Sequence, residues 1–234
     1  MAPDSLRRER SGTGGEGTGV ADGQTATQLY AVIEAGEAAL DRLTAALSAV
    51  EFASLLIAPP AGGALDAPAA RALVDAAQRE NVAVLIAGDA RLARTLRADG
   101  VHLSVANDLA GAYAEARGIL GQGGIIGVDA GISRHDAMTL AEAGADYIAF
   151  GAPPHLRDRD KARVRRDELI AWWAEIFQAP CVACDVETAW ETEALVRAGA
   201  DFIGVRLPAG ATPAATRELV ASIAAALGVP ASAG

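Results

Sequence analysis

The sequence predicts a single (β/α)8 barrel over residues 28–234, and three observations support this prediction. Eight short apolar runs alternate strictly with eight longer amphipathic ones from Gln28 onward. The chain is 51% hydrophobic but only 4% aromatic, so its core must consist mainly of Ala, Leu, Val and Ile, as in helices packed on a buried parallel sheet. One pattern of helix end, turn and strand also occurs three times. Together these features fit a closed barrel better than an open doubly wound sheet.

Strands and helices are each predicted from their hydrophobic period. Short apolar runs predict strands at 28–34, 53–58, 82–88, 101–104, 125–128, 147–151, 181–185 and 202–206. Apolar residues three and four positions apart, such as Leu40, Leu43 and Leu47, predict helices between them. Those helices are expected at 36–50, 67–81, 90–99, 109–120, 133–144, 166–177, 188–199 and 213–228.

The repeated pattern comprises "LRADGVHL" (96–103), "LAEAGADYIAF" (140–150) and "LVRAGADFIGV" (195–205). In each copy a glycine is expected to end the helix, because a left-handed backbone is least costly there. The copies precede the fourth, sixth and eighth strands, as expected for the even-numbered layer of a barrel.

Residues 1–27 differ from the rest of the chain. They are rich in Gly, Thr, Ser and charge and have almost no large apolar residue, so we expect a disordered N-terminal tail.

Composition also limits the function. A formal net charge of −10 argues against nucleic acid as a partner, and no apolar run approaches the roughly 20 residues of a membrane span. The N-terminus lacks the apolar region of a secretory signal, so a cytoplasmic location and a small-molecule ligand are expected. Cys181 and Cys184 lie three apart in a predicted strand and should point to opposite faces as buried structural residues.

Chemistry in such barrels occurs at the carboxyl ends of the strands. Asp129 and Asp185 end two predicted strands, and each is a metal ligand, a general base or a hydrogen-bonding partner for a heteroaromatic ring, or else the N-cap of the next helix. Arg206 is expected to bind a phosphate or carboxylate. Within a strand, His102 is expected to be packed and hydrogen-bonded. The other candidates at these ends are Glu34, Asp89 and Asp108.

The predicted loop "HLRDRDKARVRR" (155–166) is strongly basic in an otherwise acidic chain. Either it is a solvated loop with internal salt bridges, or it is an anion-binding lid. In the second case the substrate contacts come from His155, Arg157, Arg159 and Lys161.

"QLYAVIE", "ADGVHL", "GADYIAFG" and "VRAGADFIGV", in this order and spacing, resemble thiamine-phosphate synthase and its thiazole tautomerase-like relatives. The resemblance covers about residues 28–225 and implies a (β/α)8 barrel, often dimeric. It implies a transferase that joins a pyrimidine diphosphate to a thiazole phosphate and releases pyrophosphate with Mg²⁺. Asp89 and Asp108 would then be the metal ligands.

The chain departs from the family pattern at most strand ends. The diphosphate-binding segment after the second strand is the uncharged "LIAPPAGG", and Asp-Ala-Gly (129–131) replaces the usual Ser-x-His or Ser-x-Thr. Three hypotheses therefore stay open. The chain is a synthase with displaced binding groups, a diverged barrel enzyme for another small anionic or heterocyclic substrate, or a non-catalytic ligand-binding relative.

Overall fold

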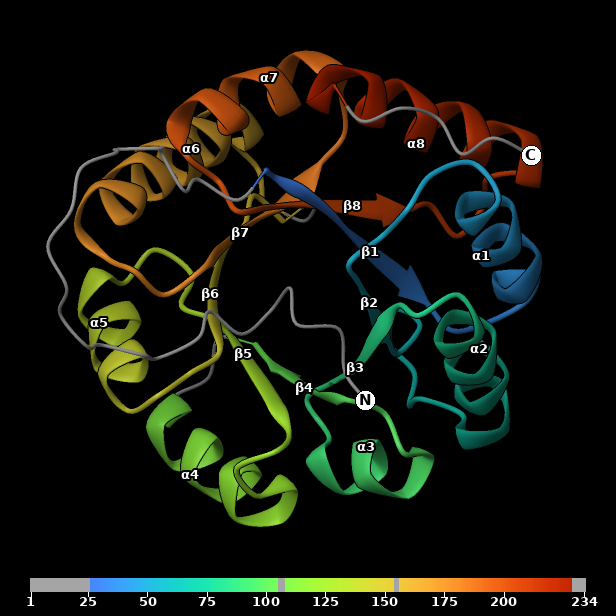
Figure 1. The fold of residues 1–234 in the computed structure, drawn as a ribbon, viewed down its shortest axis with the longest axis horizontal. Helices are drawn as coiled ribbons and strands as arrows, with labels where there is room; N and C mark the ends of the chain where they lie inside the picture. The colour runs from blue at the N-terminus through green and yellow to red at the C-terminus, as the bar shows by residue number, and fades with distance from the viewer. Residues whose placement is uncertain (1–25, 105–107, 154–155, 229–234) are drawn as a thin grey trace, which may run out of the picture.

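A computed structural model describes residues 26–104, 108–153 and 156–228. Eight parallel strands close into a barrel in the order β1-β2-β3-β4-β5-β6-β7-β8, and Figure 1 shows the helices forming a ring outside it. The predicted (β/α)8 barrel is therefore confirmed. The predicted tail falls almost entirely outside the described residues. Within them, no helix combines the length and apolar composition that a membrane span requires.

The element bounds follow the predicted order. The strands are β1 (Gln28–Glu34), β2 (Ser54–Ala58), β3 (Ala83–Ala87), β4 (Gly100–Leu103), β5 (Ile125–Asp129), β6 (Tyr147–Phe150), β7 (Cys181–Val186) and β8 (Phe202–Leu207). The helices are α1 (Ala39–Leu47), α2 (Ala67–Arg79), α3 (Ala90–Leu96), α4 (Leu109–Leu120), α5 (Arg134–Glu142), α6 (Arg159–Ile176), α7 (Ala189–Ala198) and α8 (Pro213–Leu227).

The core has two parts, because alternate residues of each strand face opposite sides of the barrel wall. The larger cluster lies between strands and helices and includes Leu55, Ile148 and Trp173. The smaller cluster fills the interior of the barrel and includes Val32 and Phe202. Cys181 belongs to the outer cluster and Cys184 packs against the inner one, so the prediction that they face opposite sides is confirmed.

A hydrogen-bonded chain of three side chains crosses the barrel interior. The Tyr30 and Tyr147 hydroxyls lie 2.8 Å apart, and the Tyr147 hydroxyl lies 2.8 Å from Nδ1 of His102. The tyrosine ring has room because Gly127 faces it, and a Cβ at that position would collide with the ring. His102 is therefore packed and hydrogen-bonded, as predicted.

The three repeated segments share a carboxylate as well as a turn. Asp99, Asp146 and Asp201 each directly precede an even-numbered strand. Their Oδ2 atoms accept hydrogen bonds from the backbone N–H groups of Val84, Ile126 and Cys181 at 2.8, 2.8 and 2.9 Å. Each turn thus joins an even-numbered strand to the odd-numbered strand before it, at the amino end of the barrel.

The predicted helix-ending glycine is correct in two copies of the repeat and wrong in the first. Gly144 and Gly199 have φ of 98° and 93°. At the equivalent place, two residues before the aspartate, the first copy has Arg97 with φ of 54°. Gly100 is instead the first residue of β4, where a Cβ would collide with the backbone of Ile125.

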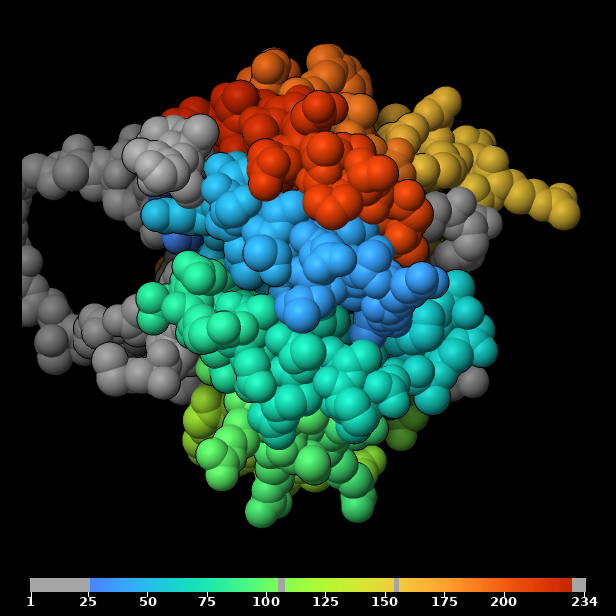
Figure 2. Space-filling view, turned by 90° about the vertical axis from the view of Figure 1, so that its right-hand side faces the viewer, coloured from blue at the N-terminus to red at the C-terminus, as the bar shows by residue number. Residues whose placement is uncertain are grey.

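The basic segment is mostly helical, which corrects the prediction of a loop up to residue 166. Helix α6 begins at Arg159, because the Asp158 carboxylate accepts a hydrogen bond from the Lys161 backbone N–H at 3.0 Å and caps the helix. In Figure 2 the gold segment at its start projects beyond the rest of the molecular surface.

Candidate active site at the carboxyl ends of the barrel strands

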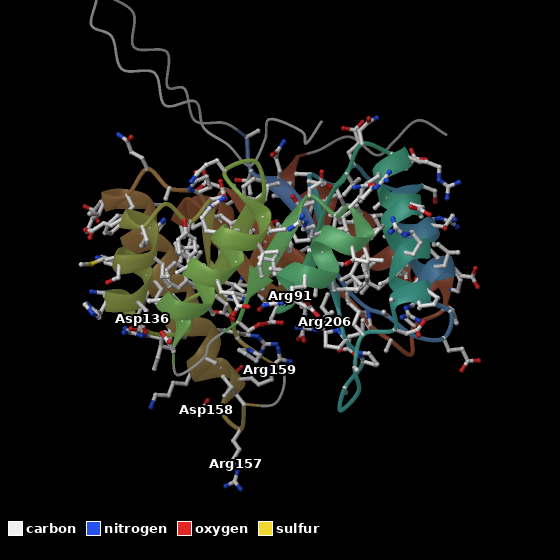
Figure 3. All side chains as sticks on the ribbon, turned by 90° about the horizontal axis from the view of Figure 1, so that it is seen from below. Arg91, Asp136, Arg157, Asp158, Arg159 and Arg206 are labelled. Carbon is white, nitrogen blue, oxygen red and sulfur yellow. The ribbon has the colours of Figure 1, made fainter. Side chains whose placement is uncertain are left out.

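Arg206 is the centre of a charged group at the mouth of the barrel. Its Nη2 donates a hydrogen bond of 2.9 Å to Oδ1 of Asp185, and its Nη1 lies 3.5 Å from Oε1 of Glu34. Glu34 ends β1, Asp185 lies near the end of β7, and Arg206 is the next-to-last residue of β8. Three strands therefore bring these predicted site residues together. Figure 3 shows Arg206 at the end of the barrel from which Arg157 projects.

A bulge in β7 turns Asp185 toward this group. Between Ala183 and Val186 strand β7 has one residue more than β8 has between the partner residues Ile203 and Val205. Regular alternation would point Asp185 outward, since Cys184 packs inward. Instead Asp185 has φ of 59°, and its Oδ2 lies 2.8 Å from where a Cβ on Gly151 would stand. The carboxylate thus faces the interior beside β6.

Asp129 lies beside Asp185 in the same mouth. Its Oδ1 accepts a hydrogen bond of 2.8 Å from the Gly131 backbone N–H. Burial raises the pKa of Asp129 to about 6; the Gly131 hydrogen bond opposes the rise and the negative charge of Asp185 adds to it. The N-cap alternative is wrong for both aspartates, because Ser133 caps α5 and Thr188 caps α7.

The predicted lid residues take different positions. Nη1 of Arg159 donates to Oε1 of Glu187 at 2.8 Å, so this arginine is already paired. Arg157 and Lys161 are exposed, and Figure 3 shows Arg157 pointing away from the barrel. His155 lies outside the described residues. The structure thus contains the ion pairs of the solvated alternative, while substrate contacts from Arg157, Arg159 and Lys161 remain a prediction.

The two predicted metal ligands cap helices. Asp89 accepts a hydrogen bond from the Leu92 backbone N–H, and Asp108 accepts one from that of Gly111, both at 2.8 Å. Across the described part of the chain, no three His, Cys, Asp or Glu side chains form a group that could hold a metal ion. Asp89 and Asp108 belong to no such group, and since Mg²⁺ usually takes only one or two protein carboxylates beside water and phosphate oxygens, their metal-binding role stays a prediction.

Sequence patterns did not connect two further residues, Cys184 and Arg166, with the mouth. Cys184 lies between the strand ends, where burial and the negative charges of Asp185 and Asp129 raise its pKa well above that of an ordinary thiol. Arg166 is fully buried and donates to the backbone carbonyl oxygens of Cys184 and Asp185 at 3.2 and 3.4 Å. In the sequence Arg166 was only the last residue of the basic segment 155–166 and the first of a predicted helix, where a basic residue usually indicates a solvated side chain.

The composition of the mouth limits what it can bind. Two carboxylates, from Glu34 and Asp185, contact the Arg206 guanidinium group, and a third, from Asp129, lies near Asp185. Such a set can donate to and accept from the ring nitrogens and amino groups of a heterocycle, and Asp129 changes protonation near neutral pH. A closed parallel barrel with polar side chains at these strand ends is the architecture of small-molecule enzymes.

The family model described as thiamine monophosphate synthase (TMP-TENI) matches residues 29–207. The chain therefore belongs to this family. A thiamine-phosphate synthase of Hyphomonas neptunium is 38% identical over 197 residues, which cover 80% of this chain and 88% of the relative. One of Erythrobacter litoralis is 42% identical over 127 residues, which cover 53% of this chain and 58% of the relative. One of Rhodospirillum centenum is 38% identical over 128 residues, covering 55% and 60%. The last two matches thus span less than two thirds of those relatives.

Solved structures agree on the fold. Thiamine phosphate pyrophosphorylase from Pyrococcus furiosus superposes with a TM-score of 0.68 at 19% identity, over 86% of this chain and 96% of that one. Tryptophan synthase of Mycobacterium tuberculosis gives the same TM-score of 0.68 at 13% identity, over 86% and 93%. At these identities the likeness supports the barrel alone.

Proposed function

We propose that the protein acts in thiamine metabolism, on a small heterocyclic substrate that binds at the carboxyl ends of the barrel strands. One observation carries this proposal: in a chain of this family, Glu34 and Asp185 converge on Arg206 beside Asp129. The reaction that the family implies is the joining of a pyrimidine diphosphate to a thiazole phosphate.

Each group has a role that its surroundings support. Asp129, with a pKa of about 6, is mostly a carboxylate at neutral pH and accepts hydrogen bonds from a ring, and its protonated fraction can donate one. Arg206 and Asp185 form a fixed pair that orients the ring through the second oxygen of the carboxylate. The exposed cations Arg157 and Lys161 are the candidates for contacts to phosphate groups.

Product formation tests the transferase. The purified protein is incubated with the pyrimidine diphosphate, the thiazole phosphate and Mg²⁺, and thiamine phosphate and pyrophosphate are measured. We expect product above a blank, and at least a roughly tenfold lower kcat/KM in Arg206→Ala. Arg197→Ala, an exposed arginine on α7, is the matched control and should behave as the unmodified protein. No product from a protein with intact circular dichroism would reject the transferase.

A second candidate, a diverged barrel that binds a heterocycle without transferring it, is favoured by the acidity of the mouth. Three carboxylates and one guanidinium disfavour a diphosphate and suit a ring with N–H donors. In a thermal-shift screen of pyrimidines and thiazoles, a compound that raises the melting temperature of the unmodified protein and not that of Asp129→Ala supports this candidate. The same screen without any stabilising compound contradicts it.

A further inference from the structure

The bulge that aims Asp185 into the mouth breaks the strand ladder. The paired residues of β6 and β7 end at Ala183, and those of β7 and β8 skip from Ala183 to Val186. Cys184 and Asp185 thus have no register partner on either neighbouring strand. A buried carbonyl that loses its ladder partner destabilises the fold unless another donor replaces it.

Arg166 supplies that donor from helix α6. Its Nη1 lies 3.2 Å from the carbonyl oxygen of Cys184 and 3.4 Å from that of Asp185, and its side chain has no exposed surface. One guanidinium therefore satisfies both carbonyls of the bulge. The same planar group reaches Glu191 through Nη2 and Asp167 through Nε, and the single nitrogen of a lysine ammonium cannot make these contacts and those to the two carbonyls together.

Glu191 holds Arg166 in place from helix α7. Its Oε1 lies 3.3 Å from Nη2 of Arg166 and 3.0 Å from Nε of Arg163. Its Oε2 accepts hydrogen bonds from the Glu187 backbone N–H and the Thr188 hydroxyl, both at 3.1 Å. Only two residues separate the end of β7 from the start of α7, so these contacts link α6, the bulge and the start of α7.

We infer that Arg166 and Glu191 are positioning residues that hold Asp185 in the left-handed backbone conformation from which its carboxylate meets Arg206. This inference rests on the proposed function only in taking the mouth as the binding site. Neither residue contacts the mouth with its own charged group. They act through the backbone of β7. A residue other than glycine stays in the left-handed region only where surrounding contacts hold it there, as at Asp185.

The test follows the ionisation of Asp129, because the negative charge of Asp185 contributes to its raised pKa. Carboxyl carbon NMR titrations compare the unmodified protein with Arg166→Lys, Asp185→Asn and the double variant. Asn tolerates the left-handed region as Asp does, so Asp185→Asn removes the charge and keeps the bulge. Arg206 and Cys184, which also face the mouth, are unchanged in all four proteins.

We expect Arg166→Lys to lower the pKa of Asp129 in the direction of Asp185→Asn, and to lower it no further in the double variant. Backbone chemical shifts of Asp185 should move from left-handed toward extended values. Arg165→Lys, which changes the exposed pair with Glu168, is the matched control and should alter neither signal.

Two results would overturn the inference. One is an unchanged pKa of Asp129 with unchanged shifts of Asp185 in folded Arg166→Lys, and the other is an additive effect in the double variant. If Arg166→Lys does not fold, Glu191→Gln takes its place, because the amide oxygen keeps an acceptor for the α7 cap. The same downward shift supports the inference and an unchanged pKa rejects it. The titration needs no substrate, so a failure of this inference is distinguishable from a failure of the proposed transferase activity.

Discussion

Asp129 ends a barrel strand with its carboxyl group largely out of water. Burial raises its folded pKa from 3.8 to about 6, so the folded protein keeps a proton that the unfolded chain has lost between these values. The stabilisation that this proton gives is complete below about pH 3.8. It disappears as the pH rises through about 6, and above that pH the fold contains an unfavourable buried carboxylate.

Asp129→Asn removes this carboxylate and tests its effect on stability. At pH 7.5 we expect the free energy of unfolding to rise by on the order of 1–2 kcal/mol, less than the full shift implies because the group is partly exposed. At pH 4.5 the gain should largely vanish. Urea unfolding at both pH values measures it, with the exposed Asp136→Asn as control. An equal effect at both pH values would contradict the assigned pKa.

Among the elements, the repeated turn before β4, β6 and β8 organises the amino end of the barrel. Its left-handed residue lets the chain reverse direction, and its aspartate ties the even-numbered strand to the preceding odd one. These turns lie at the amino end of the barrel, and barrel chemistry takes place at the carboxyl end. We therefore expect the turns to contribute to stability and not to catalysis.

Gly199→Ala tests the turn before β8. The glycine has φ of 93°, and an added Cβ would lie 2.6 Å from the Cβ of Ala174, so both backbone strain and a steric clash are expected. We expect a loss of about 2–4 kcal/mol in the free energy of unfolding. Gly228→Ala has φ of 73° but open space around the new atom, and should lose only about 1 kcal/mol. Equal losses would show that the clash with α6 is relieved.

Asp146→Ala tests the carboxylate of the same turn. It removes the acceptor of the Ile126 N–H and a mostly buried ion pair of 3.0 Å with Arg117. We expect a loss of about 2–3 kcal/mol, measured by urea unfolding. Asp75→Ala, at an exposed position of α2, is the control. A loss no larger than that of the control would rule out a bracing role for the turn.

On the scale of the whole molecule, the barrel interior contains a neutral histidine. Burial lowers the pKa of His102 from 6.5 to about 4. The effect of pH on the free energy of unfolding is therefore opposite to that of Asp129. The contribution of neutral His102 to stability is complete above the unfolded pKa of 6.5. It is lost as the pH falls toward 4, because the unfolded chain takes up a proton that the folded barrel excludes.

His102→Gln keeps a partner for the Tyr147 hydroxyl and removes the titration. Between pH 7 and pH 4.5 we expect the unmodified protein to lose roughly 2 kcal/mol through His102, partly offset by Asp129. The variant should lose less over the same range in thermal or urea unfolding. A pH dependence identical to that of the unmodified protein would exclude His102 as the cause.

Much of the molecule was predictable from hydrophobic period alone. Strict alternation of strand and helix predicted eight units, and every strand bound agrees with the structure to within one residue. Asp129 and Arg206 were predictable as mouth residues because regular alternation from Val128 and Val205 places them inward. The extent of α6 was missed, because its charged first turns lack an apolar period and Asp158 signals the start only as a cap.

The sequence by itself determined the barrel, the order of its elements and the strand ends at which its ionisable residues lie. These features follow from local periods of two and 3.6 residues, which need no knowledge of distant contacts. Only the tertiary structure decided which of those residues meet. The bulge in β7 reverses the direction of Asp185, and Arg166 from another helix donates to the carbonyl oxygens of its two residues, which have no register partner on the neighbouring strands. No local pattern encodes that contact, because it joins residues 18 and 19 positions apart through a buried side chain.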